Sequence, residues 1–225
     1  MFIGHFAVAF AAKPLVPRTS LATLMAAAQL LDLIWPVLVL LGIETVRIDP
    51  TAASPFLKLR FVHYPWTHSL LMAVVWGVAF AVAYRARTGH ARGAIAVGTL
   101  VVSHWILDWL THRPDLQLAP GVDARVGLGL WTSPAATIAV EGLLFIAGVA
   151  VYARTTRARD RAGAWGLWGF VAFLLVAYAA SLGGGAPPSP KVVAATALVG
   201  WAMIPWIAWF DRHRSAPGTE TAAPG

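Results

Sequence analysis

Four side chains with metal-ligand chemistry lie inside otherwise apolar stretches of the chain: Asp32, His68, His104 and Asp108. An ionisable group inside a membrane is costly unless it is paired, hydrated or coordinated, so such groups are functional candidates. Two imidazoles and two carboxylates suit zinc or a similar divalent ion. The sequence therefore predicts a metal site built from these four residues, with zinc as the expected ion.

The spacing of His104 and Asp108 is the strongest local signal. Residues four apart lie on the same face of a helix, so a histidine and a carboxylate at this spacing can bind one ion together. His112 extends the same stripe at or beyond the edge of the membrane. The alternative is a buried hydrogen bond between histidine and aspartate that only joins helices.

A second motif surrounds His68. Pro65 disfavours helix at the residue before it, so we expect His63 in an outer loop and His68 in the first turn of the following span. Thr67 and Ser69 can cap that helix or orient the imidazole.

Asp32 precedes Pro36 by one helical turn. The proline removes the hydrogen bond to the Asp32 carbonyl, which predicts a kink that opens the backbone beside the acid. The alternative is an acid that stays protonated within the bundle.

The elements that must position these residues are membrane-spanning helices. Of the 225 residues, 58% are hydrophobic and 12% charged, whereas soluble domains have roughly 25% charged residues. We predict an all-α, polytopic membrane helical bundle with about six transmembrane helices and a short N-terminal half-helix. Residues 1–210 form its single integral-membrane domain, and residues 211–225 are expected to be a disordered cytoplasmic tail. The predicted spans are Leu21–Ile43, Trp66–Tyr84, Gly93–Leu110, Pro134–Ala153, Ala164–Leu182 and Val192–Phe210.

Charge and composition set the expected location and partners. Arginines crowd the second and fourth connections and the tail, so the positive-inside rule places both termini in the cytoplasm of a bacterial-type inner membrane. The net charge of +7 is spread along this rim, which argues against nucleic-acid binding and leaves membrane lipid as the expected partner. The start of the chain lacks the pattern of a signal peptide. The absence of cysteine excludes disulfides and thiolate ligands.

Counting depth turns the ligands into one site. At ~1.5 Å per helical residue, Asp32 and His104 lie roughly 16 Å above the cytoplasmic boundary, Asp108 about 22 Å and His68 roughly 24 Å. Glu141 falls near 18 Å on the same scale. If Phe2–Ala12 forms a half-helix rather than lying on the membrane surface, His5 joins them at about 12 Å. These groups are thus expected in one slab that extends into the outer leaflet.

These motifs resemble those of the YdjM-like inner-membrane proteins, a family described as metal-dependent hydrolases. The resemblance covers roughly residues 1–112, with a looser similarity over 129–141. One departure is that the family often shows Pro-Asp-x-Asp where this chain has a single carboxylate, Asp32, which weakens the case for two metal ions. The matching residues are His5, Asp32, Thr67, His68, Ser69, His104, Asp108 and Thr111.

The resulting hypothesis is a membrane-embedded hydrolase. A divalent ion bound by His68, His104, Asp108 and either Asp32 or His5 would activate water. Glu141, or whichever of Asp32 and His5 is not a ligand, would be the general base. A lipid or lipid-linked phosphate or ester is the expected substrate. Two alternatives remain: a proton- or cation-coupled transporter that uses the same groups, and a scaffold with a structural metal.

Overall fold

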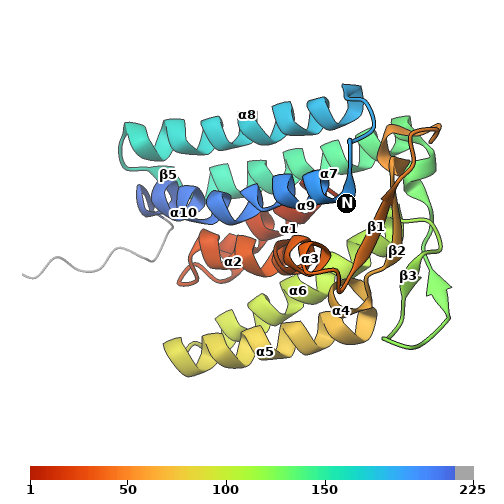
Figure 1. Ribbon diagram of the computed structural model, residues 1–225. Coiled ribbons are helices and arrows are strands. Elements are labelled where there is room, and N and C mark those ends of the chain that lie inside the picture. The colour runs from red at the N-terminus through yellow and green to blue at the C-terminus, as the bar shows by residue number, and fades with distance from the viewer. Residues whose placement is uncertain (216–225) are drawn as a thin grey trace, which may run out of the picture.

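The long apolar segments form long helices. The computed structural model describes residues 1–215, in which five helices are long and apolar enough to span a membrane, or six if one bent pair counts as a single span (Figure 1). This confirms the predicted all-α polytopic bundle. The five spans are α5 (Leu70–Thr88), α6 (Ala91–Thr111), α7 (Pro134–Thr155), α8 (Arg161–Gly183) and the continuous pair α9 (Pro190–Ala197) and α10 (Val199–Arg212).

The first predicted span is broken. It consists of α2 (Leu21–Ala28) and α3 (Leu30–Leu40), which meet at an angle of 53°. The predicted kink at Pro36 is wrong in its position, because Pro36 lies inside α3 and the break is at Gln29. Gln29 has φ −102° and ψ 2°, outside the helical region. The break therefore lies before Asp32 rather than after it.

The second predicted span begins differently from the prediction. The short helix α4 (Pro65–His68) ends at His68, and α5 begins two residues later. Ser69 between them is extended, and its hydroxyl accepts a hydrogen bond from the Met72 amide at 3.3 Å. His68 is thus the last residue of α4 and not part of the first turn of the span. An N-cap serine that starts a new helix is the physical reason.

Helix α1 (Ile3–Ala12), followed by a 3-10 turn at Lys13–Leu15, is buried inside the bundle and contacts α2, α6 and α7. This confirms the half-helix and excludes a position on the membrane surface. Close packing depends on Gly148 of α7, where an added Cβ would overlap the backbone of Ala7. Glycine lets the backbones of α1 and α7 approach, as small residues do between membrane helices.

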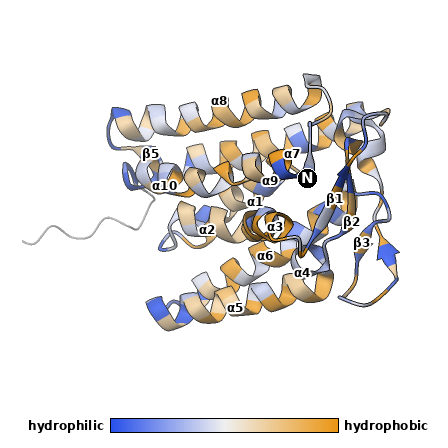
Figure 2. Ribbon diagram, in the orientation of Figure 1, coloured by the Kyte–Doolittle hydropathy of each residue, from blue (hydrophilic) through white to orange (hydrophobic). Residues whose placement is uncertain are grey.

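Three antiparallel strand pairs complete the described chain: β1 (Thr45–Ile48) with β2 (Leu59–His63), β3 (Leu116–Gln117) with β4 (Arg125–Val126), and β5 (Arg157–Ala158) with β6 (Arg214–Ser215). The first two pairs lie at one end of the bundle, which Figure 2 shows to be more hydrophilic than the helices. Of the predicted tail, residues 211–215 belong to α10, β6 and the turn between them, and residues 216–225 lie outside the described part.

Candidate metal centre

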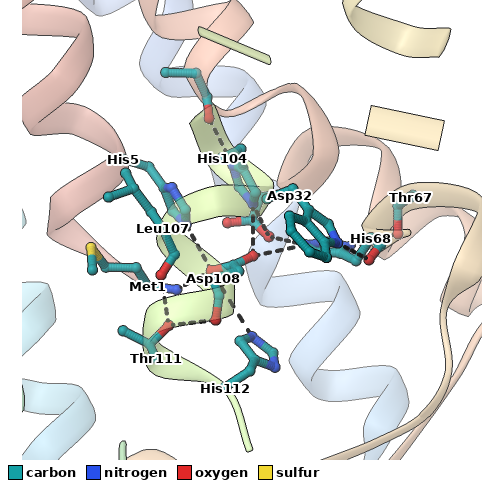
Figure 3. Close-up of polar contacts among 12 residues, drawn as sticks. Met1, His5, Asp32, Thr67, His68, His104, Leu107, Asp108, Thr111 and His112 are labelled. Atoms are coloured by element: carbon teal, nitrogen blue, oxygen red, sulfur yellow. Dashed lines mark hydrogen bonds and ion pairs between the residues drawn. The ribbon is translucent and has the colours of Figure 1, made fainter. Parts of the chain in front are cut away.

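Five of the six predicted site residues meet in the interior of the bundle (Figure 3). They form two overlapping groups, each with ligand atoms within 4.8 Å of one another, and His104 belongs to both. One group is His5, Asp32 and His104, and the other is His68, His104 and Asp108. The four helices α1, α3, α4 and α6 supply them. Each group could hold a metal ion.

Both imidazole Nε2 atoms of His68 and His104 face two carboxylates. His104 Nε2 lies 3.2 Å from Asp108 Oδ2 and 3.8 Å from Asp32 Oδ1. His68 Nε2 lies 3.6 Å from Asp108 Oδ2 and 3.4 Å from Asp32 Oδ1. Two nitrogens and two oxygens therefore surround one point, and they come from three helices.

The break in the first span fixes the tautomer of His104. At this break the Ala28 carbonyl accepts a hydrogen bond from His104 Nδ1 at 2.7 Å. Since Nδ1 carries a proton, Nε2 is the nitrogen that presents a lone pair when the imidazole is neutral. Although Asp108 is near, this buried Nε2 makes no hydrogen bond within the described chain. A plain histidine–aspartate hydrogen bond at this nitrogen, the structural alternative, is not what the geometry shows.

His68 is oriented by a chain of side chains that begins at Glu44. The Thr67 hydroxyl donates to Glu44 Oε2 at 2.7 Å, and the Thr67 amide donates to Glu44 Oε1 at 2.9 Å. Because its proton is used, the hydroxyl accepts from His68 Nδ1, also at 2.7 Å. In the neutral imidazole, His68 Nε2 is therefore the nitrogen that can bind a cation. This confirms that Thr67 orients the imidazole.

Glu44 is not among the site residues that the sequence predicted; it directly follows the first predicted span. It is almost completely buried, and burial raises the pKa of its carboxyl, while the hydrogen bonds from Thr67 act in the opposite direction. The signal that could have identified it is its position: it directly follows an apolar span and precedes the strand β1.

The donor set fits a divalent cation. Two nitrogen lone pairs and two carboxylate oxygens face one another, and such acceptors repel unless a proton or a cation lies between them. Histidine nitrogens held by a backbone carbonyl or a hydroxyl on their far side are the usual arrangement around zinc. Asp32 is the accessible member, with 45% of its side chain exposed, whereas the other side chains are at most 5% exposed.

His5 lies on the opposite side of Asp108. Its Nε2 is 3.1 Å from Asp108 Oδ1, an oxygen that the Met1 amino group also contacts. Its ring stacks on that of His104, with centroids 3.6 Å apart and an interplanar angle of 1°. His5 therefore both holds Asp108 and, with Asp32 and His104, forms the second possible metal group.

Glu141 does not belong to either group. One of its carboxylate oxygens accepts hydrogen bonds from the amides of Phe2 at 2.8 Å and Gly4 at 3.4 Å. These amides are at the start of α1, where a carboxylate is stabilised by unpaired N–H groups and the helix dipole. The contacts of Glu141 thus hold the helix that carries His5.

The stripe predicted to continue to His112 reaches a second polar group. His112 Nε2 is 4.0 Å from Asp108 Oδ1, and its Nδ1 is 3.0 Å from Asp115 Oδ1. Tyr64 donates its hydroxyl proton to the same Asp115 oxygen at 2.8 Å. Burial and the charge of Asp115 raise the pKa of Tyr64, which keeps this hydroxyl a donor. A line of polar side chains thus connects the cluster to the strand-bearing end of the molecule.

Comparison with known proteins gives one match. No curated protein and no solved structure matches the chain. A family model, that of the YdjM inner membrane protein, matches residues 1–184. The matched part contains every member of the cluster and four of the five long spans. The chain therefore belongs to the YdjM inner membrane protein family and is a multi-pass protein of the inner membrane.

Proposed function

We propose that this protein is a membrane-embedded, metal-dependent hydrolase. Its ion, for which zinc is our choice, would be bound by His68, His104 and Asp108, with Asp32 beside it and one position left for water. One observation supports the proposal most strongly. In His68 and in His104, a hydrogen bond holds Nδ1, so the Nε2 atoms of both rings point toward the carboxylates of Asp32 and Asp108. When bound, the ion would supply Lewis-acid activation of water and of a substrate oxygen.

The residues of the chain have separate tasks in this proposal. Asp108 is buried and shared by His5, His68 and His104, so it would be the fixed carboxylate of the centre. Asp32 is the exposed carboxylate, so substrate and water would reach the centre past it. A carboxylate beside both imidazoles can accept a proton from a water at the ion, which makes Asp32 our candidate for the general base.

A lipid or lipid-linked phosphate or ester is the substrate class that we propose. The cluster lies within a bundle whose outer faces carry exposed apolar side chains, so membrane lipids surround it and are the substrates nearest to hand. Membership of an inner-membrane family agrees with this substrate class. The proposal includes the orientation in which both termini are cytoplasmic, as the arginine distribution predicts.

A screen of lipid phosphates, esters and amides tests the activity. The protein in phospholipid nanodiscs would be stripped of metal, reloaded with zinc, manganese or iron, and assayed for hydrolysis. We expect the metal-loaded wild type to hydrolyse one of these substrate classes, and the exposed control Asp123→Asn to do the same. The metal-free protein and Asp108→Asn should not hydrolyse it. If the protein binds metal but hydrolyses none of these substrate classes, the result contradicts the hydrolase proposal and favours a scaffold with a structural metal.

Cation transport is a second candidate, and the broken first span favours it. Transporters form their ion sites at interrupted helices in the membrane, and the break at Gln29 lies beside the cluster. Flux of zinc or protons into proteoliposomes that is lost in Asp32→Asn, together with no hydrolysis, would select transport over hydrolysis.

A further inference from the structure

The outer surface of α5 and α6 carries a long apolar groove. Its volume is about 720 Å³, and small side chains form its floor where Gly77 and Gly98 bring the two helices together. A Cβ built on Gly98 would lie 3.2 Å from the Gly77 carbonyl oxygen, so the backbones are almost in contact there. The walls are apolar side chains that face the lipid, among them Val78, Val82 and Ile95.

A basic pocket adjoins one end of this groove. Its volume is about 550 Å³, and it is lined by Arg18, Arg85 and Arg92 together with Thr88 and His90. Arg85 lines both the pocket and the groove. Within residues 1–215, none of these arginines is paired with a carboxylate, so their charge is available to a ligand.

The pocket is built for an anion. Arginine binds phosphate with parallel N–H donors. The pocket also contains the first residues of α6, where unpaired backbone N–H groups and the helix dipole favour negative charge. The three arginines and the start of α6 together indicate that a negatively charged headgroup binds beside Arg85.

We propose that this joined groove and pocket bind an anionic phospholipid. The phosphate would lie among Arg18, Arg85 and Arg92, and one acyl chain would follow the groove toward Thr99. A basic pocket at the end of membrane helices recognises such headgroups, and a second copy of this chain would not explain three unpaired arginines at the end of an apolar groove. None of the five cluster residues lines either surface, so the lipid site is independent of the proposed metal centre.

Native mass spectrometry of the detergent-purified protein tests this proposal. Phosphatidylglycerol would be titrated against phosphatidylcholine with the same chains, and inorganic phosphate would serve as the headgroup alone. We expect the wild type to bind phosphatidylglycerol at least tenfold more tightly than phosphatidylcholine. The double variant Arg85→Gln/Arg92→Gln should lose roughly fivefold in affinity for each arginine removed. Its control is Arg157→Gln/Arg159→Gln, two exposed arginines outside the pocket.

A matched pair of α5 variants tests the groove. Ala86 lines it, whereas Ala83 is exposed on the same helix and does not. Ala86→Phe should weaken binding of phosphatidylglycerol, and Ala83→Phe should leave it unchanged. Equal affinity for both lipids, or equal loss in the arginine variant and its control, would overturn the proposal. A third result would also overturn it: inorganic phosphate binds as tightly as phosphatidylglycerol, and Ala86→Phe has no effect on lipid binding. The pocket would then bind a free anion and not a lipid.

Discussion

His104 donates its Nδ1 proton to the carbonyl of Ala28, 2.7 Å away, at the point where the first membrane helix breaks. This hydrogen bond connects the irregular backbone at the helix break to a ligand of the candidate metal centre. A backbone carbonyl becomes available where the helix is interrupted, and its acceptance of the Nδ1 proton leaves the other nitrogen ready for a cation. The helix break and the ligand geometry are thus one feature of the fold.

Removal of the hydroxyl that orients His68 should weaken metal binding without removing a ligand. In Thr67→Val, His68 Nδ1 loses its acceptor, so the imidazole can rotate or change tautomer. Loss of such a partner typically lowers metal affinity about 10–100-fold. Competition with a chelator of known affinity measures this change. Thr99→Val, on the exposed face of α6, is the control and should bind metal like the wild type.

Glu44→Gln should have a smaller effect than Thr67→Val. Glutamine can still accept one hydrogen bond from Thr67 but not two, so the hydroxyl keeps its position with a weaker partner. The same chelator competition separates the two variants. A loss of affinity in Glu44→Gln that exceeds the loss in Thr67→Val would show that Glu44 acts on the centre by another route.

Glu141→Gln should separate a helix-holding role from the role of general base that the sequence suggested. If its contacts with the start of α1 matter most, the variant loses stability, by about 1.5–3 kcal/mol for hydrogen bonds to a charged group. Thermal unfolding in detergent measures this loss. Unchanged stability and metal content together with abolished hydrolysis would instead make Glu141 the base.

The packing of α1 on α7 can be tested with two glycines of one helix. Gly148→Ala places a methyl group against the backbone of Ala7, so it should lower the melting temperature and displace His5. Gly142→Ala meets open space and should be neutral or slightly stabilising, because alanine favours helix by about 1 kcal/mol over glycine. Equal melting temperatures for the two variants would contradict the close approach.

Chelation should destabilise the wild type selectively. A ligand that binds only the folded state at 100 times its Kd contributes about 2.7 kcal/mol. The melting temperature of the metal-loaded wild type should therefore fall on chelation, and that of Asp108→Asn should not change. A parallel fall in both would mean that the chelator acts on the protein elsewhere.

Counting the fixed rise of a helix predicted that six groups lie in one slab, and five of them meet in one cluster. Glu141, counted to the middle of that slab, contacts the start of α1 instead. The sequence did not predict the break at Gln29, where the hydrogen bond from His104 to the Ala28 carbonyl forms only after the helices pack. The break at Ser69 is a local N-cap, which the sequence offered but did not place. Glu44 was missed because its partner Thr67 is 23 residues away in the chain, and only the fold brings them together.

Metal content measured by mass spectrometry of the purified protein shows whether the cluster binds an ion. We expect close to one divalent ion per wild-type chain, the same content in the exposed controls His63→Ala and Asp123→Asn, and near-background content in His104→Ala and Asp108→Asn. Equal metal content in the cluster variants and their controls would contradict the metal centre, since the two lone pairs and two carboxylates would then have no cation to bind.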